Sequence, residues 1–210
     1  MTENLNARME TFCDGVFAIA ITLLILEVKS PIPENVHTSG ALWVSLKHLL
    51  PSIYAFLLSF TVILISWVNH HTIMKLVNKH TPQFIYSNGL LLLSIAFIPF
   101  PTALLAEFVF TDAASPAVVL YSMAILFTNI SWILVSQTAL KPKPLTINEV
   151  SKKAMEDVFR KGIYAFILYL FCTILAFWLP LVSAIIITLT WLAWLIIGIN
   201  IKHQNNLNGI

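Results

Sequence analysis

An acidic side chain interrupts the apolar segment near the start of the chain. Asp14 lies in the stretch RMETFCDGVFAIAITLLILEV, which begins at Arg8. A helix needs about 20 residues to cross a bilayer, so a spanning helix here must extend over about 8–29, and Asp14 then lies below the membrane surface. An ionisable group at that depth costs at least about 2.5 kcal/mol, so it marks a specifically paired or functional site.

Polar residues that can pair with this acid end the second apolar segment and begin the third. Trp67, His70 and His71 close the second segment, and Asn88 follows early in the third. Consecutive spans run in opposite directions, so we expect all four residues and Asp14 in one third of the membrane. A buried carboxylate needs hydrogen-bond donors, which imidazole and amide groups supply. Three interpretations remain open: a structural polar knot, a knot that also senses protons, and a proton or cation site in a transporter.

Several other kinds of chemistry are disfavoured. His70 and His71 are adjacent, so their side chains point about 100° apart and cannot hold one metal ion from the same helical face. Cys13 and Cys172 both lie in apolar segments without metal-type spacing around them. No Ser-His-Asp arrangement, paired catalytic carboxylates or glycine-rich phosphate loop stands out. We therefore expect no enzyme, no bound metal and no cofactor.

The first apolar segment also carries a stripe of aliphatic side chains. Ile19, Leu23 and Leu26 follow the i, i+4, i+7 spacing of one helical face, and Thr22 lies beside them. An ordinary stripe of this kind packs on neighbouring helices or faces lipid. The alternative is a ring of such residues around a symmetry axis, which forms a constriction that loses its water when narrow.

The composition of the chain is typical of a membrane protein. Of its 210 residues, 58% are hydrophobic and 10% are charged, whereas a soluble domain is usually about 25% charged. The net charge of +2 is too small to indicate a nucleic-acid partner. The sequence therefore predicts an all-α polytopic protein whose surroundings are the lipid bilayer.

Hydropathy predicts one domain, 1–210, with six spans. A further amphipathic helix on the cytoplasmic side is predicted over 146–159, because Thr146 and Glu149 have the spacing of a capping box. That helix is either a plain surface helix or a site for regulation or a partner. Pro99 and Pro101 should kink or unwind the third span. The six predicted spans are 8–29, 41–71, 84–107, 116–139, 160–178 and 180–201.

Basic residues alternate between the connecting segments. They are frequent between the second and third spans and between the fourth and fifth, and scarce in the other connections. Basic connections lie on the cytoplasmic side, so both termini should be cytoplasmic. The first-span pattern is not repeated later in the chain, so a pore lined by this helix requires several copies of the chain.

The start of the first span resembles a known family signature. Arg8, Phe12, Cys13 and Asp14 reproduce the pattern RxxxFSD of the transmembrane protein 175 family, with Cys13 in place of serine. The Trp67-x-x-His70-His71 end of the second span, Asn88, and the Pro99-Phe100-x-Thr102 stretch are also similar to prokaryotic members.

This resemblance implies a function and roles for individual residues. Members are potassium-permeable cation channels without the TVGYG filter, which this chain also lacks. Prokaryotic members have six helices per chain and assemble as homotetramers, with four copies of the first helix around the pore. By position, Ile19 matches the narrow hydrophobic gate, Leu23 and Leu26 match further pore positions, and Thr22 matches a threonine associated with selectivity. The residues matching the network that holds the first helix are Arg8, Phe12, Cys13, Asp14, Trp67, His70, His71 and Asn88.

The favoured function is thus a potassium-permeable channel in a prokaryotic inner membrane, with potassium as the permeant ion. The alternative is a proton-coupled secondary transporter that uses Asp14 and the pair His70 and His71. A third interpretation is an assembly or scaffold protein in which the polar knot has only a structural role.

Overall fold

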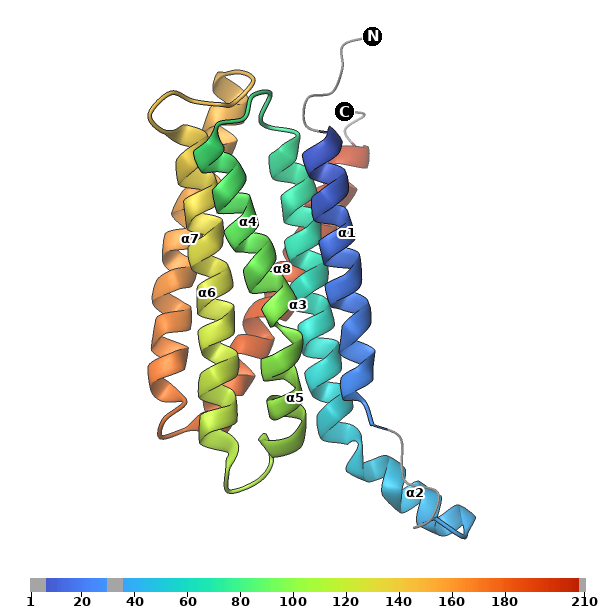
Figure 1. Cartoon of the computed structure of the whole chain (residues 1–210). Helices are drawn as coiled ribbons and strands as arrows, with labels where there is room; N and C mark the ends of the chain where they lie inside the picture. The colour runs from blue at the N-terminus through green and yellow to red at the C-terminus, as the bar shows by residue number, and fades with distance from the viewer. Residues whose placement is uncertain (1–6, 30–35, 208–210) are drawn as a thin grey trace.

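Long helices make up almost all of the chain (Figure 1). The computed structural model describes residues 7–29 and 36–207, and it describes side chains as far as residue 196. The helices in this part of the chain are α1 (Ala7–Leu23), the 3-10 helix η1 (Leu24–Glu27), α2 (Ser39–His48), α3 (Leu50–Met74), α4 (Pro82–Phe97), α5 (Pro99–Phe108), α6 (Ala114–Leu140), α7 (Glu149–Leu175) and α8 (Pro180–Leu207).

Several of these helices have the length and composition of membrane spans. Five segments qualify within the described residues, and the part of α8 over Pro180–Ile196 is a shorter apolar helix. Helix α1 begins and α8 ends at the same end of the bundle (Figure 1). The protein is therefore an integral, multi-pass membrane protein. The five segments are Ala7–Glu27, Leu50–Met74, Pro82–Phe108, Ala114–Leu140 and Glu149–Leu175.

Helix α6 is central to the bundle and packs against α4, α5, α7 and α8. Polar side chains in this core satisfy one another, as a buried hydroxyl must. The Ser59 hydroxyl lies 2.6 Å from the Thr102 hydroxyl and 3.0 Å from the Tyr121 hydroxyl, which joins α3, α5 and α6. Helix α1 lies at one edge of the bundle, antiparallel to α3, and packs against α3 and α4.

Prolines interrupt two of the predicted spans. The prediction of one helix over 41–71 is wrong, because α2 ends at His48 and α3 begins at Leu50. Pro51 has no N–H to continue the ladder, and its ring conflicts with the carbonyl four residues earlier. The third predicted span is also interrupted, since α4 ends at Phe97 and α5 begins at Pro99. The helical hydrogen bonds are thus interrupted where a kink was predicted from Pro99 and Pro101.

The helix predicted over 146–159 and the fifth span that follows it form one continuous helix. Helix α7 runs without a break from Glu149 to Leu175, since that stretch contains no proline. Its N-cap is Asn148, whose side chain accepts a hydrogen bond of 2.8 Å from the Ser151 N–H. Thr146 does not cap the helix, because its backbone forms a β-bridge with Val77 in the α3–α4 connection.

This bridge ties the two basic connections together at one end of the bundle. The Asn78 N–H donates to the Leu145 carbonyl at 3.1 Å, and the Ile147 N–H donates to the Leu76 carbonyl at 3.0 Å. These backbone bonds satisfy groups that helix ends leave unpaired.

Candidate functional site

Helix α1 and the 3-10 helix η1 that continues it have two unlike faces, which are described together as the faces of α1. The face turned toward its own chain carries Cys13, Phe17, Ala20 and Leu24, which are 0–3% exposed. Their spacing of three and four residues makes a continuous stripe that packs on α3 and α4. The register of α1 against the rest of the chain is therefore fixed by burial of this stripe.

The opposite face of α1 is apolar and uncovered within one chain. Ile19, Leu23 and Leu26 are 61%, 43% and 69% exposed, respectively, and Phe12 is 66% exposed. The predicted stripe thus does not pack inside its own chain. In a membrane, such a face contacts either lipid or another copy of the chain.

Thr22 lies on this uncovered face, and its hydroxyl is bound to the helix behind it. Its oxygen lies 2.9 Å from the carbonyl oxygens of both Ala18 and Ile19, so the hydroxyl proton is donated to the backbone. The lone pairs of that oxygen then remain on the exposed side, where they can accept from water or approach a cation. This type of backbone bonding also bends helices, and α1 changes to the 3-10 helix η1 directly after Leu23.

Two polar contacts clamp the first part of α1 onto the end of α3. The Glu10 carboxylate accepts a hydrogen bond from His71 Nδ1 at 2.8 Å, and the Asp14 carboxylate accepts one from Trp67 Nε1 at 2.9 Å. In each helix the two residues are four apart, so they lie one turn above the other on one face. Because the helices are antiparallel, the two contacts lie one helical turn apart along the same α1–α3 interface.

A third contact lies deeper, between α3 and α4. His70 and Asn88 are buried, and His70 Nε2 lies 3.1 Å from Asn88 Oδ1. The Asn88 amide N–H donates to the Phe84 carbonyl at 2.8 Å, so Oδ1 is the acceptor and His70 carries its proton on Nε2. The Phe17 ring packs beside the imidazole, with their centroids 5.5 Å apart. This contact supports the surface on which α1 rests.

The predicted knot is therefore divided into three pairs. Asp14 accepts its hydrogen bond from Trp67, while His70 bonds Asn88 on α4 and His71 bonds Glu10 on α1. Glu10 was missed as a member, although its position four residues before Asp14 indicated the same face.

The remaining members of the predicted network lie on different sides of α1. Arg8 and Phe12 are on the exposed face, outside these contacts, whereas Cys13 is buried against the chain at 1% exposure. A thiol is a weaker hydrogen-bonding group than a hydroxyl, and at position 13 it behaves as a small apolar residue. The polar groups described so far hold α1 in place, and its other face stays open.

The comparisons with known proteins agree with this arrangement. The model of the family described as endosomal/lysosomal potassium channel TMEM175 matches residues 8–99, which include α1 and both helices that clamp it. A protein of Chamaesiphon minutus named as a potassium channel is 43% identical over 164 residues, which are 76% of this chain and 80% of that protein. The chain belongs to the TMEM175 family.

Two further similarities extend over different parts of this TMEM175 family member. A protein of Streptomyces collinus named as a potassium channel is 42% identical over 135 residues, covering 61% of this chain and 64% of that protein. The crystal structure of a lysosomal potassium-selective channel TMEM175 homolog from Chamaesiphon minutus superposes with a TM-score of 0.81 at 36% identity. It covers 91% of this chain and 96% of that chain. The similarity in fold therefore includes the second half of the chain, beyond the residues that match the family model.

Proposed function

We propose that the protein is a potassium-permeable cation channel whose pore is lined by the exposed face of α1. The observation that carries the proposal is the uncovered aliphatic stripe of Ile19, Leu23 and Leu26, opposite the stripe that packs on the chain. Rings of such residues around an axis narrow an aqueous path and control it by dewetting. Relatives named as potassium channels support this function over proton-coupled transport.

The pore requires more than one copy of the chain. A single helix cannot enclose an aqueous path, and we infer a homotetramer with four copies of α1 around one axis. A closed cyclic assembly is the usual arrangement for identical subunits. A monomer as the largest species in native mass spectrometry of the detergent-solubilised protein would contradict this assembly.

The resemblance to the TMEM175 signature implies roles within the pore, and the exposure of this face of α1 supports them. Ile19 forms the gate, Leu23 and Leu26 extend the constriction, and Thr22 supplies oxygen lone pairs that influence which cation passes. The polar pairs on α3 and α4 hold α1 so that this face points to the axis. No cofactor takes part, and the potassium ion is cargo.

The orientation in the membrane follows from charge. The joined basic connections, which include Lys75, Lys79, Lys141 and Lys143, lie at the end of the bundle where α1 begins. By the positive-inside rule we assign that end to the cytoplasm, which puts both termini there and gives six spans. We place the protein in a prokaryotic inner membrane.

Ion flux through purified protein in liposomes tests the proposal. We expect passive potassium flux that exceeds sodium flux and does not depend on a proton gradient. Replacing Ile19 by Asn should increase the flux and reduce the preference for potassium, because a polar ring stays wet. The matched control is Ile167→Asn on α7, since Ile167 is also 61% exposed but lies away from α1. Impermeability to potassium, or flux coupled to protons, would contradict the channel.

A further inference from the structure

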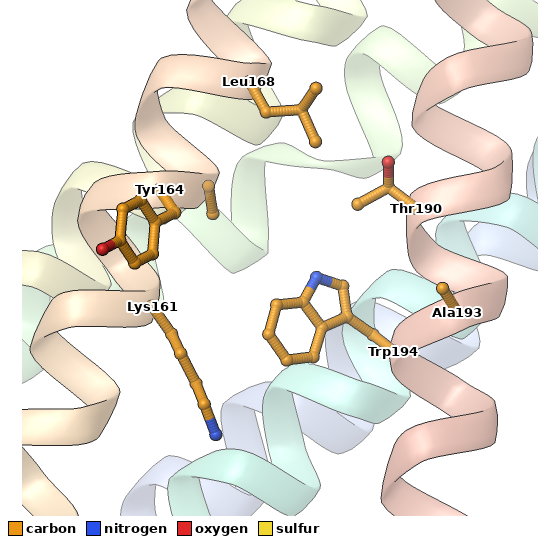
Figure 2. A pocket seen from close by; sticks show the side chains of 7 residues that line it. Lys161, Tyr164, Leu168, Thr190, Ala193 and Trp194 are labelled. Carbon is orange, nitrogen blue, oxygen red and sulfur yellow. The ribbon is translucent and has the colours of Figure 1, made fainter.

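A groove lies between α7 and α8. It has a volume of about 380 Å³, within the range of roughly 300–1,000 Å³ found for ligand sites. Helix α7 lies at the opposite edge of the bundle from α1 (Figure 1), so the groove does not coincide with the proposed pore. Figure 2 shows the seven residues that line it: Lys161, Tyr164, Ala165, Leu168, Thr190, Ala193 and Trp194.

The groove results from the way in which the two helices cross. Near the turn that joins them they are held together, since the Ser183 hydroxyl donates to the Cys172 carbonyl at 2.8 Å. Tyr169 and Trp191 stack further along, with ring centroids 6.2 Å apart. Helix α8 then runs diagonally behind the bundle and away from α7 (Figure 1).

Two small side chains keep the space between the helices open. Ala165 on α7 and Ala193 on α8 both line the groove, where larger residues would fill it. The lining positions on each helix are spaced by three and four residues, so the groove has one face of α7 and one of α8 as its walls. Most of this wall is apolar, as expected of a surface that contacts acyl chains.

A cation without an ion-pair partner stands at one end of the groove. Among the described residues, Lys161 takes part in no salt bridge, whereas Arg160 pairs with Asp157 and Lys152 pairs with Glu149. In Figure 2 the Lys161 side chain extends toward the N-terminal end of α7, away from Leu168. The ammonium group therefore points toward the end of the bundle that carries the basic connections.

The depth of Lys161 explains this direction. It is 14 residues before the end of α7 at Leu175, or about 21 Å at 1.5 Å per residue. Taking Leu175 as the far edge of a hydrocarbon layer about 30 Å thick places Lys161 within that layer, toward the end where α7 begins. A lysine at this level extends its ammonium group to the headgroups while its methylenes stay in apolar surroundings.

We propose that the α7–α8 groove binds one anionic phospholipid. Lys161 contacts the phosphate, Tyr164 and Trp194 flank the headgroup, and an acyl chain runs past the two alanines toward Leu168. Tyrosine and tryptophan are the residues that favour the membrane interface, and basic pockets between spans bind anionic headgroups. The site goes beyond the proposed channel function, and its binding can be measured without any ion flux.

Native mass spectrometry of the full chain in detergent, titrated with single lipids, tests this site. We expect phosphatidylglycerol to bind more tightly than phosphatidylethanolamine. Lys161→Gln should weaken phosphatidylglycerol binding about fivefold, the value for one lysine near a headgroup. It should weaken phosphatidylethanolamine binding less, because the ammonium group of that lipid offsets the charge of its phosphate. Lys161→Arg should retain binding. The matched control is Lys153→Gln, since Lys153 is an exposed lysine on the same helix outside the groove.

A second variant tests the apolar part of the groove. Ala165→Phe fills the space without altering charge, and it should weaken phosphatidylglycerol binding as well. Soluble glycerol phosphate should not compete, because it lacks acyl chains. Equal affinity for the two lipids, no effect of Lys161→Gln, or full binding by Ala165→Phe would overturn the proposal.

Discussion

Thr22 is the only residue of the proposed constriction, Ile19 to Leu26, whose side chain carries an oxygen. Its hydroxyl proton is committed to the carbonyls of Ala18 and Ile19, so only lone pairs face outward. A group that only accepts favours cations over anions. The Thr22 hydroxyl thus gives a preference for cations to a proposed constriction whose other side chains are apolar.

Replacing Thr22 by Val should lower the ratio of potassium to sodium flux, because the isosteric side chain keeps its shape and loses its oxygen. Thr22→Ser should keep the ratio. The control is Thr72→Val, because Thr72 is also exposed and bonds its own helix at 2.9 Å. Flux ratios in liposomes measure the effect, and an unchanged ratio in Thr22→Val would count against the role of Thr22.

The contact between Asp14 and Trp67 is one of the two polar pairs that hold α1 against α3. Trp67→Phe should destabilise the protein by about 1–3 kcal/mol, because the carboxylate loses a donor and hydrogen bonds to charged groups are the stronger ones. Thermal unfolding in detergent measures the change. Trp43→Phe is the control, since the Trp43 side chain is 68% exposed. If both variants unfold at the same temperature, the contact does not hold α1.

At the scale of elements, the sequence was most informative about where helices cross the membrane. Six spans were predicted, and the described residues contain five segments of spanning length and one shorter apolar helix, Pro180–Ile196. The helix boundaries were less predictable, since they depend on contacts between distant residues. Thr146 has the sequence pattern of an N-cap, but its backbone forms a β-bridge with Val77. Asn148 caps α7 instead.

The membership of the polar pairs was predictable only in part, since Glu10 was missed, and the pairing was not predictable. Depth along the helices brought Asp14, Trp67, His70, His71 and Asn88 to the same level. Which donor meets which acceptor depends on how the helices rotate about their axes, and this rotation is set by the buried stripe of α1. The sequence therefore could not choose between Trp67 and a histidine as the partner of Asp14.

Close packing of α6 on α7 depends on one glycine. A side chain at Gly162 would place its first carbon 3.0 Å from Ile133 Cγ1, whereas Gly89 on α4 has open space. Gly162→Val should therefore destabilise the protein by about 1–3 kcal/mol. Gly89→Val is the control, and Ile133→Ala combined with Gly162→Val should recover part of the loss. Unfolding temperatures measure the series, and equal values for the two valine variants would contradict the close approach.

At the scale of the whole molecule, one chain leaves an apolar face of α1 uncovered. The buried stripe and the polar clamp hold α1 on the bundle, and the other face needs either lipid or other copies of α1. The sequence predicted the aliphatic stripe, but it could not distinguish a face that contacts lipid from one that contacts other copies of α1, because both require apolar side chains. The proposed channel requires other copies of α1 around a shared axis.

The accessibility of position 19 to water tests this account most directly. We would introduce Ile19→Cys and, as a control, Ile167→Cys; the native Cys13 and Cys172 are buried at 1% and 0% exposure. A positively charged thiol reagent should block potassium flux through Ile19→Cys and leave flux through Ile167→Cys and the unaltered protein unchanged. Potassium flux that persists through Ile19→Cys after exposure to the reagent would contradict the claim that this face of α1 lines the pore.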